Sequence, residues 1–342
     1  MKDTKITIKD VARIAGTSVA TVSNVMNGAG RVSEATKQKI NAIIEELEFA
    51  PSTAARNLRD KRSSLIAVVV PYMETGKLMD NPFYWQLVTG IEEGARSKRL
   101  HIILVGVETD ETFSFIRERQ IDGLIVIGAV KASPILKRIQ KLKVPVVFVD
   151  SYLQDDQLPH ISLDDELGGY IGTKHLLALG HRDIMLLSGK LGEQGVHYYR
   201  WLGYCRALTE SGIELREELV LQEPVSALSG YRIASAIVAH ATTTNISAVF
   251  CLSDVTAIGL LKGLYDLGIS VPQQISVMGF DNSDQASYTI PALTTVHQNI
   301  AQKGEQAIKQ LIALMDGEAV EQRQIVLGVE LVVRQSATRY QR

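Results

Sequence analysis

Polar residues that could bind a small molecule follow several short apolar runs of the sequence. Four of these polar residues lie at or just after the end of an apolar run: Tyr72, Asp150, Ser253 and Asp281. A fifth, Arg200, lies at the start of the helical segment that follows a run. Open α/β sheets bind ligands at the carboxyl ends of their strands, so runs that form such strands would bring these side chains together. A guanidinium and a carboxylate suit a hydroxyl-rich ligand. Two alternatives stay open: Asp254 could cap a helix, and Asp281 could hold a turn with the residues that follow it.

A second group of polar residues lies near the N-terminus. A segment with helical spacing opens at Ser18 and continues through Thr21, and its first residues are small enough to enter a major groove of DNA. Hydroxyl groups there can hydrogen-bond phosphates, as can the free N–H groups of a helix end. A three-helix cap on an enzyme would show the same spacing, so the pattern alone leaves both interpretations open.

The sequence lacks the motifs of several enzyme classes. It contains no Walker-type phosphate loop, no Gly-x-Ser-x-Gly and no His-Glu-x-x-His. Gly189, Gly192 and Gly195 have the wrong spacing for a dinucleotide-binding loop. The 7 histidines are scattered, and we interpret His181 and His297 as hydrogen-bonded structural groups. We therefore expect no enzymatic activity, no metal and no cofactor.

Composition indicates a globular chain with a basic N-terminal part. Of the 342 residues, 46% are hydrophobic and 22% are charged, which excludes a disordered chain. The 2 cysteines exclude a disulfide framework and fit a reducing cytosol. We see no signal-peptide pattern and no apolar run near the ~20 residues that cross a membrane, so we expect a cytoplasmic protein rather than a transport-type binding protein. Residues 1–64 carry 11 Lys and Arg against 7 Asp and Glu, a modest basic excess that favours a nucleic-acid partner.

Helix signals divide the first 50 residues into three helices. Thr7 with Asp10 has the spacing of a capping box, and Gly16 ends the helix that follows. Ser18 is expected to cap a second helix and Ser33 a third. The spacing of the apolar residues predicts one buried face on the third helix, formed by Ile40, Ile43, Ile44 and Leu47.

From residue 65 onward, short apolar runs alternate with longer amphipathic segments. The runs are residues 65–70, 101–107, 123–127, 144–149, 183–187, 248–252 and 275–279. The helical segments between them lie near residues 82–99, 132–141, 165–179, 197–211, 228–240, 254–267 and 300–315. Continuous apolar runs are typical of parallel strands that are covered on both faces. This array is long for one open sheet, so we expect two doubly wound subdomains.

Several motifs resemble the lactose/galactose repressor (LacI/GalR) family. They are residues 8–12 (IKDVA), 15–18 (AGTS), 21–27 (TVSNVMN), 32–36 (VSEAT), 49–52 (FAPS), 54–58 (AARNL), 81–84 (NPFY), 120–123 (QIDG), 176–181 (LLALGH), 279–282 (GFDN) and 291–296 (PALTTV). The resemblance implies an α/β chain with an all-α helix-turn-helix head and a two-lobed core of doubly wound parallel sheets, similar to periplasmic binding proteins. It also implies an effector-controlled transcription regulator, usually a repressor, that binds double-stranded palindromic operator DNA.

The resemblance assigns roles to residues of the head. Positions that read base edges in the family are occupied here by Val19, Ala20 and Asn24. Positions that touch or frame phosphates are occupied by Ser18, Thr21, Ser23, Asn27, Arg31, Ser33 and Thr36. Leu58 matches a hinge leucine that wedges into the minor groove, with Ala55 and Arg59 beside it. The alternatives are that Ser18 and Ser33 only cap helices and that Leu58 packs against the head.

The resemblance also assigns an effector pocket between the two lobes. Its lining would be Phe83, Tyr84, Asp150, Arg200, Ser253, Asp281 and Gln298, with Tyr72 nearby. Phe83 alternatively belongs to the core. A sugar or sugar derivative is the favoured effector, and a nucleobase, a nucleoside or a protein corepressor remains an alternative, as does activation in place of repression. Residues 334–342 contain no leucine heptads, so a homodimer is expected.

The expected boundaries place the head at residues 1–50, a hinge helix and linker at 51–64, and the core at 65–342. One lobe would hold about residues 65–162 and 293–322, and the other about residues 163–292 and 323–342. Two features depart from the family. Val225 stands where some members carry an aromatic residue, and the segment before Asp122 is short, which predicts a truncated second helix in the first lobe.

Overall fold

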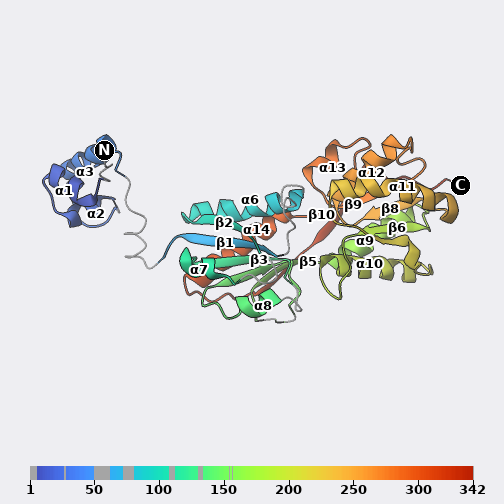
Figure 1. Cartoon of the computed structure of the whole chain (residues 1–342), viewed down its shortest axis with the longest axis horizontal. Helices are drawn as coiled ribbons and strands as arrows, with labels where there is room; N and C mark the ends of the chain where they lie inside the picture. Colours follow the sequence, from blue (N-terminus) through green and yellow to red (C-terminus); the bar gives the residue numbers. More distant parts are fainter. Residues whose placement is uncertain are drawn as a thin grey trace. The chain divides into compact units, whose positions relative to one another are not determined.

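The computed structural model divides the chain into two units, residues 1–63 and 64–342 (Figure 1). The residues that it describes are 6–26, 28–49, 62–71, 81–107, 112–129, 134–153, 155 and 157–341. The first unit contains three short helices, and the second contains two six-stranded sheets.

Three helices form the head: α1 (Ile8–Ala15), α2 (Val19–Met26) and α3 (Glu34–Glu46). The Asp10 carboxylate accepts hydrogen bonds from the N–H of Thr7 at 3.0 Å and from its hydroxyl at 2.7 Å, and Gly16 ends α1 in the left-handed region with φ 68°. The capping signals at the start and end of this helix are therefore confirmed.

The other two caps of the head are also present. The Ser18 oxygen accepts a hydrogen bond from the N–H of Thr21 at 3.0 Å, and the Ser33 oxygen accepts one from the N–H of Thr36 at 3.3 Å. The three helices enclose one apolar core, formed by Val11, Ala12, Ala15, Val22, Ile40, Ile43 and Phe49. The head thus has a core of its own.

The first sheet of the second unit is entirely parallel, and with its helices it is called the N lobe. Its strand order is β11-β5-β4-β3-β1-β2. The strands are β1 (Leu65–Pro71), β2 (His101–Val107), β3 (Gly123–Ile127), β4 (Val146–Val149), β5 (His160–Leu163) and β11 (Gln324–Leu327). Helices α6 (Pro82–Ser97) and α14 (Ile300–Met315) cover one face, and α7 (Ser114–Glu118) and α8 (Pro134–Ile139) cover the other. The five residues of α7 agree with the short helix predicted there.

The second sheet, with its helices, is called the C lobe. Its order is β12-β10-β9-β8-β6-β7, and only β12 is antiparallel. The strands are β6 (Ile184–Ser188), β7 (Val220–Gln222), β8 (Ala248–Cys251), β9 (Ser276–Asp281), β10 (Thr294–Gln298) and β12 (Val329–Val332). Helices α9 (Asp165–Ala178) and α10 (Val196–Glu210) lie on one face, and α11 (Ala227–Thr244), α12 (Asp254–Asp266) and α13 (Asp284–Tyr288) lie on the other (Figure 1).

The chain passes between the lobes three times. The first passage joins β5 to α9, as expected. The other two differ from the expected boundaries at 293 and 323, because β10 pairs with β9 in the C lobe and β11 pairs with β5 in the N lobe. A strand bonds along its whole length to one sheet, so the chain can cross only where the strand ends. The passages therefore lie at residue 299 and residue 328.

Paired glycines allow three helix pairs to pack closely. In α11 and α12, a Cβ atom on Gly230 would lie 2.0 Å from the Thr256 carbonyl oxygen, and one on Gly259 would lie 1.9 Å from the Ala227 carbonyl oxygen. The pairs α9–α10 and α6–α14 show the same arrangement, with one such glycine on each helix. These positions therefore accept only a residue without a Cβ atom unless the helices separate.

We predict that Gly259→Ala lowers the free energy of unfolding by about 1–3 kcal/mol, because the new methyl group forces the two backbones apart. Gly106→Ala is the matched control, since a Cβ atom there meets nothing within 4 Å. Urea unfolding of both variants measures the difference. Equal stability of the two variants would contradict the close packing of α11 and α12.

Candidate functional site

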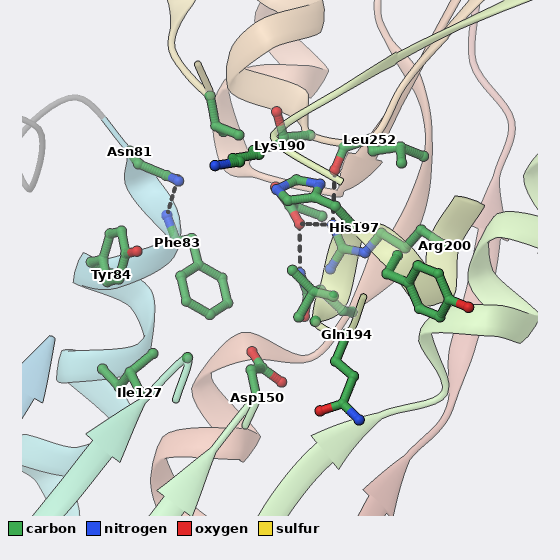
Figure 2. A pocket seen from close by; sticks show the side chains of 18 residues that line it. Asn81, Phe83, Tyr84, Ile127, Asp150, Lys190, Gln194, His197, Arg200 and Leu252 are labelled. Atoms are coloured by element: carbon green, nitrogen blue, oxygen red, sulfur yellow. Dashed lines mark hydrogen bonds and ion pairs between the residues drawn. The ribbon is translucent and has the colours of Figure 1, made fainter. Parts of the chain in front are cut away.

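A cavity of about 260 Å³ lies between the N lobe and the C lobe. The N lobe contributes Asn81, Phe83, Tyr84, Ile127, Gly128 and Asp150. The C lobe contributes Lys190, Gln194, Gly195, Val196, His197, Tyr198, Arg200, Val225, Leu252, Ser253, Asp281 and Gln298. Figure 2 shows Phe83 and Tyr84 on one side of this group and Arg200 on the other.

Seven of the eight predicted effector residues line this one cavity. They are Phe83, Tyr84, Asp150, Arg200, Ser253, Asp281 and Gln298. Tyr72 lies outside the described residues. Six of them lie at or near the end of a strand or the start of a helix, whereas Arg200 is the fifth residue of α10. Their role in binding stays a prediction.

Helix and strand ends place these side chains. The Asn81 carboxamide oxygen accepts a hydrogen bond from the N–H of Phe83 at 3.0 Å, which starts α6 at the cavity and sets Phe83 and Tyr84 in its first turn. Asp150 directly follows β4, and Asp281 ends β9; both have a positive φ, 47° and 120°. Non-glycine residues rarely adopt such φ values, which turn the side chain away from the line of the strand.

A lysine that sequence reasoning missed supports the N-lobe side of the cavity. Lys303 of α14 is fully buried, and its ammonium group donates to both carboxylate oxygens of Asp150, at 2.7 and 2.8 Å. The same group donates to Oε1 of Gln298 at 2.6 Å. It also lies 5.6 Å from the centre of the Phe83 ring. The Asp150 charge is therefore neutralised within the protein.

Arg200 is held equally firmly on the C-lobe side. Its Nε donates to Asp165 Oδ1 at 2.7 Å, and its Nη1 donates to the Leu252 carbonyl at 2.8 Å. The guanidinium stacks on the Phe280 ring at 3.6 Å and lies 3.7 Å from Asp281. The prediction that Arg200 lies at the cavity agrees with its position, and two of its five N–H donors form these hydrogen bonds inside the protein.

The sequence left the roles of Asp254 and Asp281 open, and the two carboxylates have different surroundings. Asp281 accepts a hydrogen bond from the Gln298 amide at 2.5 Å and faces the cavity. Asp254 is fully buried outside it and accepts from the Ser283 N–H at 2.7 Å and the Thr295 hydroxyl at 2.6 Å. Asp254, not Asp281, therefore holds the turn after β9, and Ser253 is the residue at the N-cap of α12.

Burial also changes the acidity of these groups. It raises the pKa of Asp281 to about 6, although Arg200 and Gln298 favour the charged form. Burial and the neighbouring Asp281 raise the pKa of Asp254 to about 8. Burial, with Arg200 nearby, lowers the pKa of His197 to about 4, so that its ring is neutral at pH 7. At pH 7 the cavity wall therefore places the neutral ring of His197 near the charged guanidinium of Arg200.

Sequence reasoning also missed Lys190, Gln194 and His197. They belong to the glycine-containing loop after β6 and to the first turn of α10. The rule that selected Asp150 and Asp281, that ligands bind at the carboxyl ends of strands, would have selected this loop too. We considered the glycines of this loop only as a possible dinucleotide-binding loop, which their spacing excludes.

The head presents the predicted reading residues on its surface. Val19, Ala20 and Asn24 of α2 are exposed, whereas Val22 on the same helix is buried in the core. Ser18, Arg31 and Ser33 are also exposed, and Thr21, Ser23 and Thr36 are partly buried. Ser18 and Ser33 act as caps, a role compatible with phosphate contact, which stays a prediction. Asn27, Ala55, Leu58 and Arg59 lie outside the described residues.

The histidines that we interpreted as structural have protein partners. His181 hydrogen-bonds the Ser247 hydroxyl at 2.8 Å and the Thr338 carbonyl at 3.0 Å, and His297 bonds the Asn282 amide at 3.1 Å. Within the described ranges, no three His, Cys, Asp or Glu residues group as metal ligands would. None of the helices in that part of the chain is long and apolar enough to cross a membrane.

Two segments match known families. Residues 7–52 match the family described as bacterial regulatory proteins, lacI family. Residues 173–337 match the periplasmic binding protein-like domain. The first match covers the helices of the head, and the second covers most of the C lobe and part of the N lobe.

Solved structures share the architecture. The Lac repressor dimer bound to operator and the anti-inducer ONPF is 29% identical, with a TM-score of 0.82, and the match covers 97% of this chain and 99% of that one. The complex of the transcriptional regulator CelR with cellobiose is 27% identical, with a TM-score of 0.73, covering 97% and 100%.

Relatives match over almost the whole sequence. The HTH-type transcriptional regulator RegA of Clostridium saccharobutylicum is 32% identical over 336 residues, which cover 96% of this chain and 98% of RegA. The HTH-type transcriptional regulator DegA of Bacillus subtilis is 32% identical over 342 residues, which cover 98% of each chain. This chain therefore belongs to the lacI family of bacterial regulatory proteins and is a DNA-binding transcriptional regulator, not an enzyme.

Proposed function

We propose that the protein is a homodimeric repressor whose affinity for a palindromic operator is set by a small hydroxyl-rich ligand in the interlobe cavity. One observation carries the proposal: the cavity is lined by polar groups from both lobes, among them Asp150 from one and Arg200 and Asp281 from the other. A ligand that contacts both lobes changes the free energy of their closure. Its site of action is the bacterial chromosome, so the protein works in the cytoplasm.

The lining favours a sugar or sugar derivative. The amide of Gln298 and the carboxylate of Asp281 can exchange hydrogen bonds with hydroxyl groups, and the ring of Phe83 offers a flat apolar face. Val225 lines the cavity where some family members carry an aromatic residue, which disfavours a ligand stacked between two rings. Solved relatives contain cellobiose in one case and ribose in another.

The proposed mechanism is a population shift. Three chain passages connect the lobes, and one closure state arranges the two hinge segments of the dimer for operator binding. A ligand with different affinities for the two closure states changes operator affinity by the ratio of those affinities. We favour release from the operator on ligand binding.

An exposed apolar surface on the C lobe supports dimerisation. Helices α11, α12 and α13 cover the same face of the second sheet, and the chain there exposes Tyr265 (75%), Tyr288 (83%) and Ile290 (95%). Monomeric proteins rarely leave large apolar side chains grouped in water. The Lac repressor, which shares this architecture, was solved as a dimer. We infer that a second copy covers this surface.

We predict that Arg200→Lys weakens binding of the effector by about 10- to 100-fold, because lysine cannot reproduce the two-pronged geometry of the guanidinium. Operator affinity without ligand stays within about twofold of the wild type, since the charge opposite Asp165 is kept. Arg206→Lys is the control, because Arg206 lies on the same helix and pairs with Glu166 at the surface. Screening by thermal shift against sugars, followed by calorimetry, measures the change. Wild-type ligand affinity in Arg200→Lys would refute its role.

Two variants of the head separate base reading from phosphate contact. We predict that Asn24→Ala costs about 1–3 kcal/mol on the cognate operator and much less on unrelated DNA. Arg31→Gln is expected to weaken binding to all sequences equally and to reduce the salt slope by about 1. Fluorescence anisotropy at several salt concentrations distinguishes the two patterns. A uniform loss from Asn24→Ala would remove this residue from the set that reads bases.

For the dimer, we predict that Ile290→Asp shifts the protein to a monomer at micromolar concentration and lowers operator affinity at least about tenfold, because a carboxylate would be buried in an apolar contact. The side chain is exposed in the single chain, so folding is unaffected. Leu215→Asp, in the loop after α10, is the control. Sedimentation velocity that finds Ile290→Asp dimeric would place the interface elsewhere.

A further inference from the structure

The charged side chains around the cavity differ in whether they have partners within the protein. Both oxygens of Asp150 receive hydrogen bonds from Lys303, and Asp281 receives one from Gln298 with Arg200 at 3.7 Å. The two carboxylates of the wall are therefore already neutralised by groups of the protein. A positively charged ligand would have to displace these partners, whereas a neutral or anionic one would not.

Lys190 differs from these charged side chains because it has no ion-pair partner among the described residues. It lines the cavity from the loop after β6, and its side chain is exposed. Figure 2 shows it on the opposite side of the labelled side chains from Asp150. Arg200 and Lys303, the other cations at the site, both have carboxylate partners. The wall thus offers one positive charge that a ligand could neutralise.

Helix α10 adds to this positive side. Its N-cap is Gly195, which supplies no side chain, and its first turn holds no acidic residue. Gly195, Val196, His197 and Tyr198 all line the cavity, so the first N–H groups of a 15-residue helix lie at the cavity wall. The Nδ1 atom of His197 is buried and has no hydrogen-bond partner among the described residues. Buried polar atoms usually have partners, so this nitrogen can form a hydrogen bond with a ligand in the cavity that His197 lines.

We propose that the effector is an anionic sugar, in which a phosphate or carboxylate group binds Lys190 and the start of α10 while the hydroxyl groups contact Asp281 and Gln298. The inference rests on the proposed function, since it assigns the ligand class of the same cavity. The geometry is suitable because Lys190 and the start of α10 both line the C-lobe side of the cavity, and Lys190 lies on the opposite side of the labelled side chains from Asp150 (Figure 2). A charged group held by an ammonium and a helix N-terminus forms hydrogen bonds that are stronger than those between neutral groups.

The anion site is tested first with inorganic phosphate as the probe. Phosphate replaces chloride at constant ionic strength, and the unfolding temperature of the full chain is recorded for the wild type, Lys190→Gln and Lys309→Gln. Lys309 is an exposed lysine of α14 that does not line the cavity. We expect phosphate to raise the unfolding temperature of the wild type and of Lys309→Gln more than that of Lys190→Gln. An equal rise in all three proteins, which a general salt effect would produce, or no rise at all would overturn the proposal.

The ligand class is tested next with matched pairs of compounds. Calorimetry compares ribose with ribose 5-phosphate, glucose with glucose 6-phosphate, and glucose with glucuronate. We expect the charged member of at least one pair to bind about tenfold more tightly, and Lys190→Gln to remove that preference without changing the affinity for the neutral member. The phosphate and glucuronate arms distinguish a phosphorylated sugar from a sugar acid.

The same compounds are then added to the protein bound to operator. A neutral sugar that binds most tightly and changes operator affinity would overturn the anionic ligand and leave the proposed function intact. A charged sugar that binds through Lys190 but leaves operator affinity unchanged would keep the ligand site and remove its regulatory role. Absence of binding by every compound would overturn the anionic assignment.

Discussion

The buried ion pair between Lys303 and Asp150 lies where the two lobes meet, and a hydrogen bond from the same ammonium group crosses to the C lobe. A lysine with no exposed surface is stable only if its charge is matched and its N–H groups are satisfied. Asp150 provides two acceptors and Gln298 the third, at distances of 2.6 to 2.8 Å. Because Gln298 ends a strand of the C lobe while Lys303 and Asp150 belong to the N lobe, full satisfaction of the buried ammonium group requires both lobes. Removal of any one partner would leave a buried polar group unsatisfied.

A second polar contact joins the lobes at another passage of the chain. The Tyr152 hydroxyl donates to Asp165 Oδ2 at 2.5 Å, while Asp165 Oδ1 receives the Arg200 Nε at 2.7 Å. The Tyr152 ring also stacks on Tyr199 with ring centres 4.4 Å apart. Tyr152 follows the N-lobe strand β4, and the two residues that its side chain contacts, Asp165 and Tyr199, belong to the C lobe. The lobes are therefore connected by two sets of polar contacts, and each set includes a residue that lines the cavity, Gln298 in one and Arg200 in the other.

Sequence reasoning found the parts of the fold whose signal is local. All seven apolar runs form strands, because each is long enough to be recognised as a buried strand by itself. It missed β5, β7, β10, β11 and β12, which have three to five residues, and so misplaced two lobe boundaries. It placed Asp150 and Asp281 correctly at strand ends. Lys303 was not found, since a lysine on an amphipathic helix normally faces solvent and its partner lies 153 residues earlier in the chain.

The hydrogen bonds that the cavity side chains already form also affect the binding free energy that a ligand gains from each contact. A group that binds Asp150 must compete with an ammonium that already bonds both oxygens, so the net gain from such a contact is small. Groups to which the described residues supply no partner, such as the Lys190 ammonium and the first N–H groups of α10, lose only water when a ligand binds. For the proposed ligand, we therefore expect selectivity to depend on the unpaired groups of the wall and the response of the lobes to depend on the paired ones. The proposed anionic sugar contacts both sets, because its charged group binds Lys190 while its hydroxyl groups form hydrogen bonds with Asp281 and Gln298.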